Sequence, residues 1–505
     1  MILFISNQYI YMKFTRRSLK KKRKKITSKM NKKQKADKAK NAQNSVVSKL
    51  TTSKETMCFI NKLFNKITQE STKAINSDLM LKNFMKNNKL LLPLAFRLLH
   101  MSYTKSPPNK HFGNIKSKID KKAITYSKWA NNIYSSEEKW EKFISEKKGS
   151  IIRYQSKQQL RDGFLVPKYS VVEKAGKIIV TFKGTSTGND ALIDLLANTE
   201  SFTLDKNKYY AHAGFLTAAT MVNSQVGKII KEKIISKEIT EVIVTGHSLG
   251  GGVAHMFGIL FFNSLLKGKT QETNGFKGVK IFGYAPGTTV TSKTTPPLTD
   301  FLKNHSKKIK IVSFINDQDI VPRLSIENGV ILLAVCASIA NEIFLNQENK
   351  EIFQDELKKS SIYETLYLLF KSDKFKDKNV KDIISSINGF KGGRTLKIDK
   401  RSDFWEVIKH IRDTTIKLYS SSKMLNISPP INTQPIGDLH LFNGQSFFKV
   451  KKLDFPIIKK KSLTDHGMDG YCNALKKYIQ VDNKTKKKRG KRSKKKRGKR
   501  SKKKK

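Results

Sequence analysis

Hydrophobic and polar positions change their period along the chain, and each change predicts a different kind of element. Apolar positions at helical spacing predict helices within residues 56–104 and 119–147. Residues 169–172 and 178–182 carry the β-branched and aromatic side chains typical of strands. Because the turn Lys174-Ala175-Gly176-Lys177 joins them, we expect a β-hairpin here.

Helical and strand patterns alternate after this hairpin. A helix is expected to begin near Ala211-His212-Ala213-Gly214-Phe215, and residues 242–244, 279–284 and 309–315 are predicted strands. Four apolar positions of the predicted helix share one face: Val222, Val226, Ile229 and Ile230. Since strands that alternate with helices form a mainly parallel sheet covered on both faces, the fold class predicted is α/β.

A charged helical pattern interrupts this alternation before the strand-like residues 438–442. Within it, one side of a predicted helix is formed by Phe404, Val407, Ile408, Ile411 and Leu418. We therefore expect five segments: a disordered basic arm (1–55), an α/β core that begins with a helical lead-in (56–325), a helical insertion (326–426), the C-terminal part of the core (427–482) and a disordered Lys/Arg repeat tail (483–505).

Positive charge is concentrated at the two ends of the chain. The formal net charge is +59. Residues 1–45 hold 15 Lys and Arg with one Asp, and residues 484–505 hold 17 Lys and Arg with no acid, so the ends carry about half of the excess. Such charge favours an anionic partner, either an acidic membrane surface or nucleic acid. The sequence does not predict an oligomeric state.

Cysteine usage and the apolar runs indicate the compartment. Cys58, Cys336 and Cys472 are too few and too scattered for a disulfide framework or a zinc cluster, which fits a reducing compartment. The apolar Met1–Ile5 run precedes the basic residues, the reverse of a secretory signal. Val330–Ala340 has about half the length that a spanning helix needs and predicts a buried or interfacial helix. We expect an intracellular protein, associated peripherally with membranes.

The most specific motif follows the strand at 242–244. Gly246-His247-Ser248-Leu249-Gly250 joins this strand to a helix-like apolar run, which is typical of the nucleophile elbow of an α/β-hydrolase. Glycines are required on both sides because side chains there would clash with the strand and the helix. Ser248 is then exposed on a strained turn, and the Leu249 N–H lies at a helix N-terminus, where it can stabilise an oxyanion. The alternative is a glycine-rich turn with an inert serine.

A serine nucleophile needs a histidine base, which a carboxylate holds in one tautomer. In an α/β-hydrolase the chain order is Ser, Asp, His. Asp317 and Asp319 directly follow the strand at 309–315, and both qualify as the acid by position.

Three histidines follow these acids. His410 lies on the polar side of the predicted helix, where a solvated role is favoured. His440 alternates with apolar residues in a strand, as a structural histidine does. His466 lies in a loop that opens a helix and suits a base that must reach Ser248.

Together these features resemble the class 3, or fungal-type, lipase family, which includes the diacylglycerol lipases. The resemblance covers roughly residues 120–325 and 427–480. It rests on Gly246-His247-Ser248-Leu249-Gly250-Gly251, on Asp319-Ile320-Val321-Pro322-Arg323-Leu324, and on the Asp-His-x-Met-x-x-Tyr pattern at residues 465–471. Residues 211–215 are also similar to the family's His-x-Gly-Phe element, which implies structural support near the site.

The resemblance implies roles for five residues. Ser248 would be the nucleophile, Asp319 rather than Asp317 the triad acid, and His466 the base, while Thr185 and Leu249 would supply the N–H groups of the oxyanion hole. The chain departs from the family at Lys183, where Arg is usual, and at residues 188–192, where a Trp-containing segment is usual. Lysine cannot reproduce a bidentate arginine contact.

The function expected is that of a lipase-type serine hydrolase, which cleaves the carboxylic esters of acylglycerols or phospholipids through an acyl-enzyme. No metal or organic cofactor is implied. One alternative is an acyltransferase on the same triad, and another is a basic nucleic-acid-binding or packaging protein with a relic hydrolase domain. Residues 190–197 are either a lid over the site or an ordinary buried helix.

Overall fold

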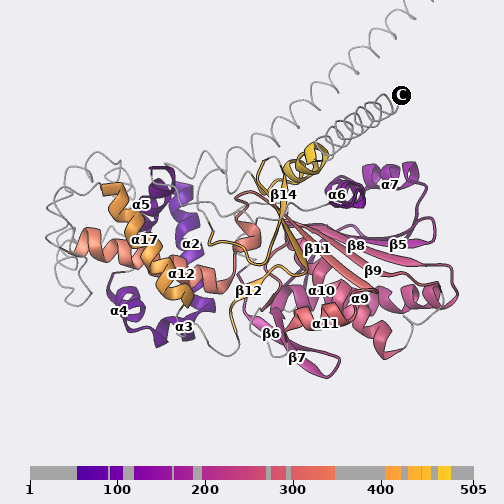
Figure 1. Cartoon of the computed structure of the whole chain (residues 1–505), viewed down its shortest axis with the longest axis horizontal. Helices are drawn as coiled ribbons and strands as arrows, with labels where there is room; N and C mark the ends of the chain where they lie inside the picture. The colour runs from indigo at the N-terminus through magenta and orange to yellow at the C-terminus, as the bar shows by residue number, and fades with distance from the viewer. Residues whose placement is uncertain are drawn as a thin grey trace, which may run out of the picture. The chain divides into compact units, whose positions relative to one another are not determined.

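Figure 1 shows the computed structural model of the chain. It describes residues 54–88, 91–105, 119–161, 164–185, 196–268, 275–291, 297–346, 404–421, 430–444, 446–456 and 465–478. The predictions for the two basic ends, for most of the lid segment and for much of the insertion therefore lie outside the described residues.

A central eight-stranded sheet confirms the α/β prediction. Its order is β1-β4-β5-β8-β9-β11-β13-β14. The neighbours β5, β8, β9, β11 and β13 are parallel, while β1, β4 and β14 are antiparallel at the edges. The strand bounds are β1 Ser150–Gln155, β4 Tyr169–Glu173, β5 Lys177–Phe182, β8 Glu241–His247, β9 Gly278–Tyr284, β11 Ile309–Asn316, β13 Asp438–Phe442 and β14 Phe447–Val450. The predicted hairpin is formed by β4 and β5.

Helices cover both faces of this sheet, as expected for parallel strands. Successive strand residues point to opposite faces, and Ile281 and Phe282 of β9 show which helices lie on each. A Cβ added to Gly258 of α10 (Leu249–Lys267) would lie 2.3 Å from the Ile281 side chain. The Phe282 ring stacks on Tyr126 of α6 (Lys122–Asn132), with ring centroids 5.0 Å apart. α9 (Ala213–Ile235) packs beside α10.

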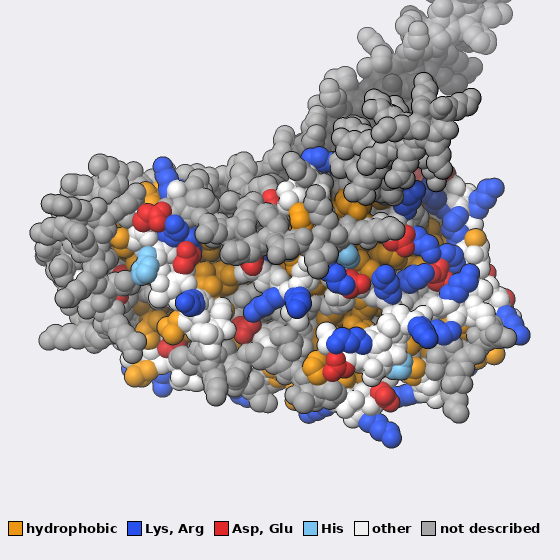
Figure 2. Space-filling model, viewed as in Figure 1, with side chains coloured by type: hydrophobic (Ala, Val, Ile, Leu, Met, Phe, Trp, Pro, Cys, Tyr) orange, Lys and Arg blue, Asp and Glu red, His pale blue; other side chains and the backbone are white. Residues whose placement is uncertain are grey.

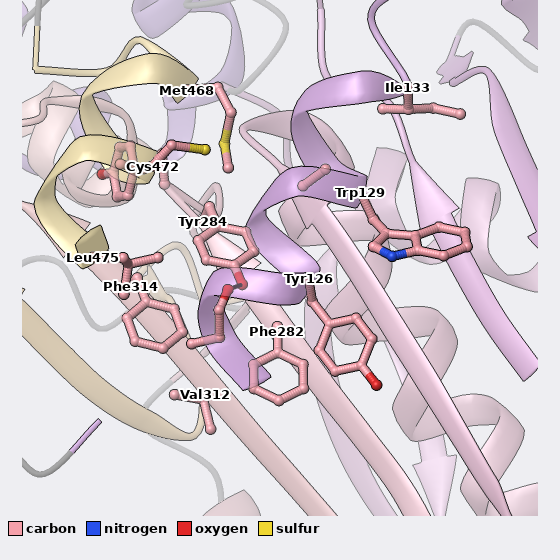
Figure 3. Packing of buried hydrophobic residues seen from close by; sticks show 14 of the residues in the cluster. Tyr126, Trp129, Ile133, Phe282, Tyr284, Val312, Phe314, Met468, Cys472 and Leu475 are labelled. Atoms are coloured by element: carbon pink, nitrogen blue, oxygen red, sulfur yellow. Dashed lines mark hydrogen bonds between the residues drawn. The ribbon is translucent and has the colours of Figure 1, made fainter. Parts of the chain in front are cut away.

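Figure 3 shows the core on the α6 side of the sheet. Tyr126, Trp129 and Ile133 come from α6, and Met468, Cys472 and Leu475 come from the helical residues 468–478. They pack over Phe282, Tyr284, Val312 and Phe314 of the sheet. α7 (Glu137–Glu146) completes this layer with the buried Trp140 and Phe143. The core thus joins segments that lie more than 300 residues apart in the sequence.

Smaller elements surround this core. A four-stranded antiparallel sheet has the order β12-β10-β7-β6, and a two-stranded sheet pairs β2 with β3. Their bounds, with that of helix α11, are β2 Gln159–Arg161, β3 Phe164–Val166, β6 Thr199–Leu204, β7 Asn207–His212, β10 Val290–Thr291, β12 Thr433–Gln434 and α11 Leu298–Asn304.

A group of helices is built from two distant parts of the chain. α12 packs against α2, α4, α5 and α17, and α17 also packs against α5. The bounds are α2 Lys54–Glu70, α3 Thr72–Ser77, α4 Leu79–Asn87, α5 Leu92–Lys105, α12 Ile326–Ala340 and α17 Phe404–Ser421, with a 3-10 turn at Val321–Arg323 and a π-helical turn at Asn341–Leu345. The sequence assigned α2–α5 to the lead-in of the core, whereas these contacts join them to the helices of the insertion. An apolar helix face does not reveal its partner in the sequence.

Two described helices, at Leu249–Lys267 and Ile326–Ile343, are long and apolar enough to cross a membrane by length and composition alone. Most of each helix is buried inside the molecule, and a core helix of a soluble protein meets the same criteria. The segment from Val330 to Ala340 lies within the buried α12, so the prediction of a buried helix there is confirmed.

Basic side chains outnumber acidic ones on the face shown in Figure 2. Three lysines surround a buried carboxylate at the start of β8. Glu241 lies 2.7 Å from the Lys177 ammonium, 3.8 Å from the Lys122 ammonium and in contact with Lys280. Burial would raise the pKa of Glu241, but hydrogen bonds and the positive charge of Lys177 and Lys280 lower it to about 2.

In two helices, one of the residues predicted to lie on the buried apolar face is exposed instead. Ile229 of α9 is 39% exposed and Leu418 of α17 is 60% exposed. The buried stripe of α9 runs through Val222, Val226, Ile230 and Ile234 at a spacing of four residues. Ile229 lies beside this stripe, because one residue corresponds to about 100° of helical rotation.

The adjacent isoleucines Ile229 and Ile230 give a matched stability test. Ile230 is fully buried, so Ile230→Ala should lower the free energy of unfolding by about 2–5 kcal/mol through lost burial and a cavity. Ile229→Ala should lower it by less than about 1 kcal/mol, because its side chain already contacts solvent. Urea unfolding of both variants measures this difference, and equal losses would contradict the orientation of α9.

Candidate active site

The turn between β8 and α10 has the geometry of the predicted nucleophile elbow. Ser248 adopts φ 60° and ψ −130°, a backbone conformation that is strained for any residue except glycine. A Cβ at Gly246 would lie 2.1 Å from the carbonyl oxygen of Gly250, and a Cβ at Gly250 would lie 2.6 Å from that of Phe182. Both positions therefore require glycine, as the sequence indicated.

Ser248, His466 and Asp319 lie in one hydrogen-bonded series. The Ser248 Oγ is 2.9 Å from His466 Nε2, and His466 Nδ1 is 3.1 Å from each carboxylate oxygen of Asp319. Asp319 is buried, and so is Ser248, which contradicts the exposed position expected for the serine, while 22% of the His466 side chain is exposed. The structure thus brings the three predicted residues together across 218 positions of sequence. Their catalytic roles stay a prediction.

The ionised state of Asp319 depends on its hydrogen bonds. Burial alone would raise the pKa of this carboxyl, because desolvation penalises the charged form. The positive charge and hydrogen bond of His466, with donors from the Tyr471 hydroxyl and the Val321 N–H, lower the pKa below its ordinary value. The Tyr471 hydroxyl oxygen lies 2.5 Å from Asp319 Oδ2, and the Val321 backbone nitrogen lies 3.0 Å from Asp319 Oδ1.

Tyr471 has a role at the site that the sequence did not assign. Its hydroxyl donates to Asp319 and accepts from the Asn316 N–H at 2.9 Å. Burial, followed by the charge of Asp319, raises the pKa of Tyr471 well above its ordinary value, so the hydroxyl remains a donor. Tyr471 stood in the recognised motif, but its spacing from His466 does not reveal that it contacts the acid.

The loop that carries His466 is attached to the end of β11. The Asp465 carbonyl accepts from the Asn316 side-chain amide at 2.9 Å, and its carboxylate accepts from the Gln318 N–H at 3.1 Å. These contacts hold His466 beside the segment that provides Asp319.

The other candidates lie elsewhere. Asp317 provides its backbone carbonyl to the Arg323 guanidinium at 2.9 Å, and its carboxylate has no hydrogen bond to His466. His410 is exposed on α17. His440 stacks on Phe314 within the sheet, and its pKa is lowered to about 4, mainly by burial. These positions agree with the preference for Asp319 and His466.

The predicted oxyanion residues flank Ser248. Leu249 is the first residue of α10, so its N–H has no acceptor within the helix. A Cβ at Gly184 would lie 2.9 Å from the Ser248 Cβ, which places the loop of Thr185 directly beside the serine. Among the described residues, the buried Thr185 Oγ1 has no hydrogen-bond partner.

The loop before Thr185 is supported by Tyr134. The Gly184 N–H donates to the Tyr134 hydroxyl at 2.9 Å. The Lys183 ammonium lies 5.5 Å from the centroid of the Tyr134 ring. Lys183, where the resembled family usually has Arg, thus contacts an aromatic face, and a tyrosine hydroxyl holds the backbone of the next residue.

The segment at 211–215 provides structural support, as the resemblance implied. His212 caps α9, accepting from the Phe215 N–H at 3.4 Å, and its ring stacks on Phe215. A Cβ at Gly252 would lie 2.3 Å from the Phe215 ring, so Phe215 packs directly against the start of α10.

Residues 179–329 match the sequence model of the family described as Lipase (class 3). This stretch includes most of β5, the elbow and Asp319. Within these residues the chain is therefore similar to the class 3 lipases. His466 and Tyr471 lie beyond the matched residues, so their place at the site rests on the contacts described above.

Lipases of Rhizopus niveus and Rhizopus oryzae are each 32% identical to this chain over 87 residues, which is 17% of this chain and 22% of theirs. The match thus spans about a fifth of the length of these relatives. Solved structures with similarity include the lipase of Rhizopus microsporus var. chinensis, at 18% identity and a TM-score of 0.32 over 43% of this chain and 74% of that one. The triacylglyceride lipase of Rhizomucor miehei is 20% identical, with a TM-score of 0.31 over 40% of this chain and 73% of its own.

The lowered pKa of Asp319 predicts a pH-dependent contribution to stability. The folded chain favours the ionised carboxyl, so this contribution is present above the ordinary pKa of 3.8 and is lost as the pH falls through the lower folded value. Asp319→Asn has no such contribution to lose. The difference in free energy of unfolding between the parent and Asp319→Asn should therefore narrow as the pH falls below about 4.

Urea unfolding at neutral and acidic pH measures this difference. Asp317→Asn is the matched control, because it removes a partly exposed carboxyl two residues away. If the free energies of unfolding of the parent and Asp319→Asn differ more at acidic pH than at neutral pH, the pKa of Asp319 is not lowered by folding.

Proposed function

We propose that this chain is a serine hydrolase that cleaves the carboxylic ester of a lipid through an acyl-enzyme. The observation that carries the proposal is the Ser248–His466–Asp319 series, with contacts of 2.9 Å and 3.1 Å. The match of residues 179–329 to the class 3 lipase model supports a lipid ester as the substrate.

The first half-reaction follows from the orientation of His466. The Asp319 carboxylate can only accept, so it holds the proton of neutral His466 on Nδ1 and leaves Nε2 free to accept. Nε2 takes the proton of Ser248 as the Oγ attacks the acyl carbonyl. The N–H groups of Leu249 and Thr185 are proposed to bind the oxyanion that forms, assisted by the N-terminus of α10.

The second half-reaction releases the acid. The imidazolium passes its proton to the departing alcohol, which leaves an ester between the acyl group and Ser248. His466 then takes a proton from water as the water attacks this ester, and returns it to the serine as the fatty acid leaves. Asp319 stays ionised throughout and stabilises the imidazolium.

A substrate panel tests the class of lipid. Acylglycerols and phospholipids with the same acyl chains should be compared, because the proposal includes both. Hydrolysis of neither, with activity on unrelated ester classes, would contradict the lipid part of the proposal while leaving the triad intact.

The role of Ser248 is tested by Ser248→Ala. This variant should lose about three or more orders of magnitude in esterase activity, because the acyl-enzyme cannot form. A fluorophosphonate probe should label the parent and not the variant. Equal labelling of both proteins would reject Ser248 as the nucleophile.

The variants His466→Ala and His440→Ala test which histidine acts as the base. His466→Ala should reduce kcat nearly as much as the loss of Ser248, since triad members act as a unit. His440→Ala should leave kcat unchanged and affect only thermal stability, because this side chain packs on Phe314. A folded but inactive His440→Ala enzyme would contradict the assignment of His466 as the base.

A further inference from the structure

His247 is a buried histidine that the proposed mechanism does not use. It precedes Ser248 and ends β8. Its Nδ1 lies 2.9 Å from the Tyr134 hydroxyl, and its Nε2 lies 2.8 Å from the backbone carbonyl oxygen of His466. Both ring nitrogens thus have partners, one on the segment after α6 and one on the residue that provides the base.

The partners determine the proton on each nitrogen. The His466 carbonyl oxygen can only accept, so Nε2 of His247 must carry a proton. In a neutral ring Nδ1 is then an acceptor, and the Tyr134 hydroxyl must donate to it. The same hydroxyl oxygen accepts from the Gly184 N–H at 2.9 Å. Every donor in this chain of groups has an acceptor.

The electrostatic environment keeps these protons in place. Burial, and then the positive charge of His466, lower the pKa of His247 to about 3, so the ring is neutral at physiological pH. Burial raises the pKa of Tyr134, which keeps its hydroxyl protonated.

We infer that Tyr134 and His247 are positioning residues, which fix the loop of Gly184 and Thr185 relative to the base His466. We call the series Gly184 N–H, Tyr134 hydroxyl, His247 ring and His466 carbonyl the Tyr134–His247 relay. The inference rests on the proposed function, in which Thr185, next to Gly184, binds the oxyanion and the ring of His466 transfers the proton.

The relay connects the loop of Gly184 with the residue that provides the base, His466, through the Tyr134 hydroxyl and the His247 ring. Gly184 also touches Ser248 and His247 closely, since a Cβ there would lie 2.4 Å from the His247 carbonyl oxygen. Loss of one relay group should therefore misplace both the oxyanion loop and the base. Such misplacement weakens interactions that strengthen in the transition state, so kcat falls while KM is unchanged.

Tyr134→Phe tests the relay with a minimal change. It should lower kcat on a dissolved short-chain ester, and the rate of fluorophosphonate labelling, by about tenfold or more, with KM unchanged. Tyr154→Phe is the matched control, because it also removes a buried tyrosine hydroxyl, one that has no hydrogen-bond partner in the described part of the chain. Equal kinetic effects of the two variants would overturn the inference.

Substitutions of His247 test the coupling. His247→Met removes both hydrogen bonds, whereas His247→Gln keeps a donor near the position of Nε2. We expect Gln to recover part of the kcat that Met loses. The double variant Tyr134→Phe/His247→Met should cost no more than His247→Met alone, because both changes break the same relay. Losses that multiply would show that the two residues act independently.

Hydrogen exchange tests the positioning role of the relay independently of the proposed hydrolase activity. Tyr134→Phe should accelerate amide exchange in residues 183–185 and in residues 465–468, and Tyr154→Phe should accelerate neither. Unchanged exchange at 465–468 in Tyr134→Phe would overturn the relay, even in an active enzyme. If the parent neither hydrolyses esters nor reacts with the probe, the proposed function fails, while coupled exchange at the two segments would still support the relay.

Discussion

The close approach of β8, α10 and the end of β5 is the constraint on which the rest of the site depends. The backbones of Gly246 and Gly250 leave no space for a Cβ, so the helix can begin one residue after Ser248. The strained backbone of Ser248 costs about 1–3 kcal/mol, which the packing of a mostly buried α10 against the sheet can offset. In return, the hydroxyl of Ser248 and the N–H of Leu249 lie side by side at one helix N-terminus.

The electrostatics of the site follow from this crowding. The rings of His247 and His466 are 4.7 Å apart between centroids, so two positive charges there would repel each other. Because burial keeps His247 neutral, the imidazolium that forms on His466 faces the ionised Asp319 without a competing cation. The buried Tyr471 hydroxyl stabilises the same carboxylate as a neutral donor and adds no charge.

Local patterns predicted the parts of the site that depend on neighbouring residues. The strand, the two glycines and the helix around Ser248 are contiguous, and Asp319 follows its strand directly. Tyr134 could not be predicted in this way, because it contacts His247 across 113 positions and the helical pattern of its own segment does not indicate that contact. The same reason explains why the sequence did not pair α2 and α5 with α12, since an apolar face specifies burial but no partner.

The long separation of Asp319 and His466 leaves their geometry intact because the sheet brings the chain back. β13 pairs in parallel with β11, from Val312 opposite Asp438 to Asn316 opposite Phe442. The entropic cost of closing a loop rises only with the logarithm of its length, so an insertion of many residues adds little once this pairing forms. The contacts of Asp465 with Asn316 and Gln318 then place His466 beside the acid. The position of the base is thus determined by β11, β13 and the 465–471 segment, which return the chain to the acid at the end of β11.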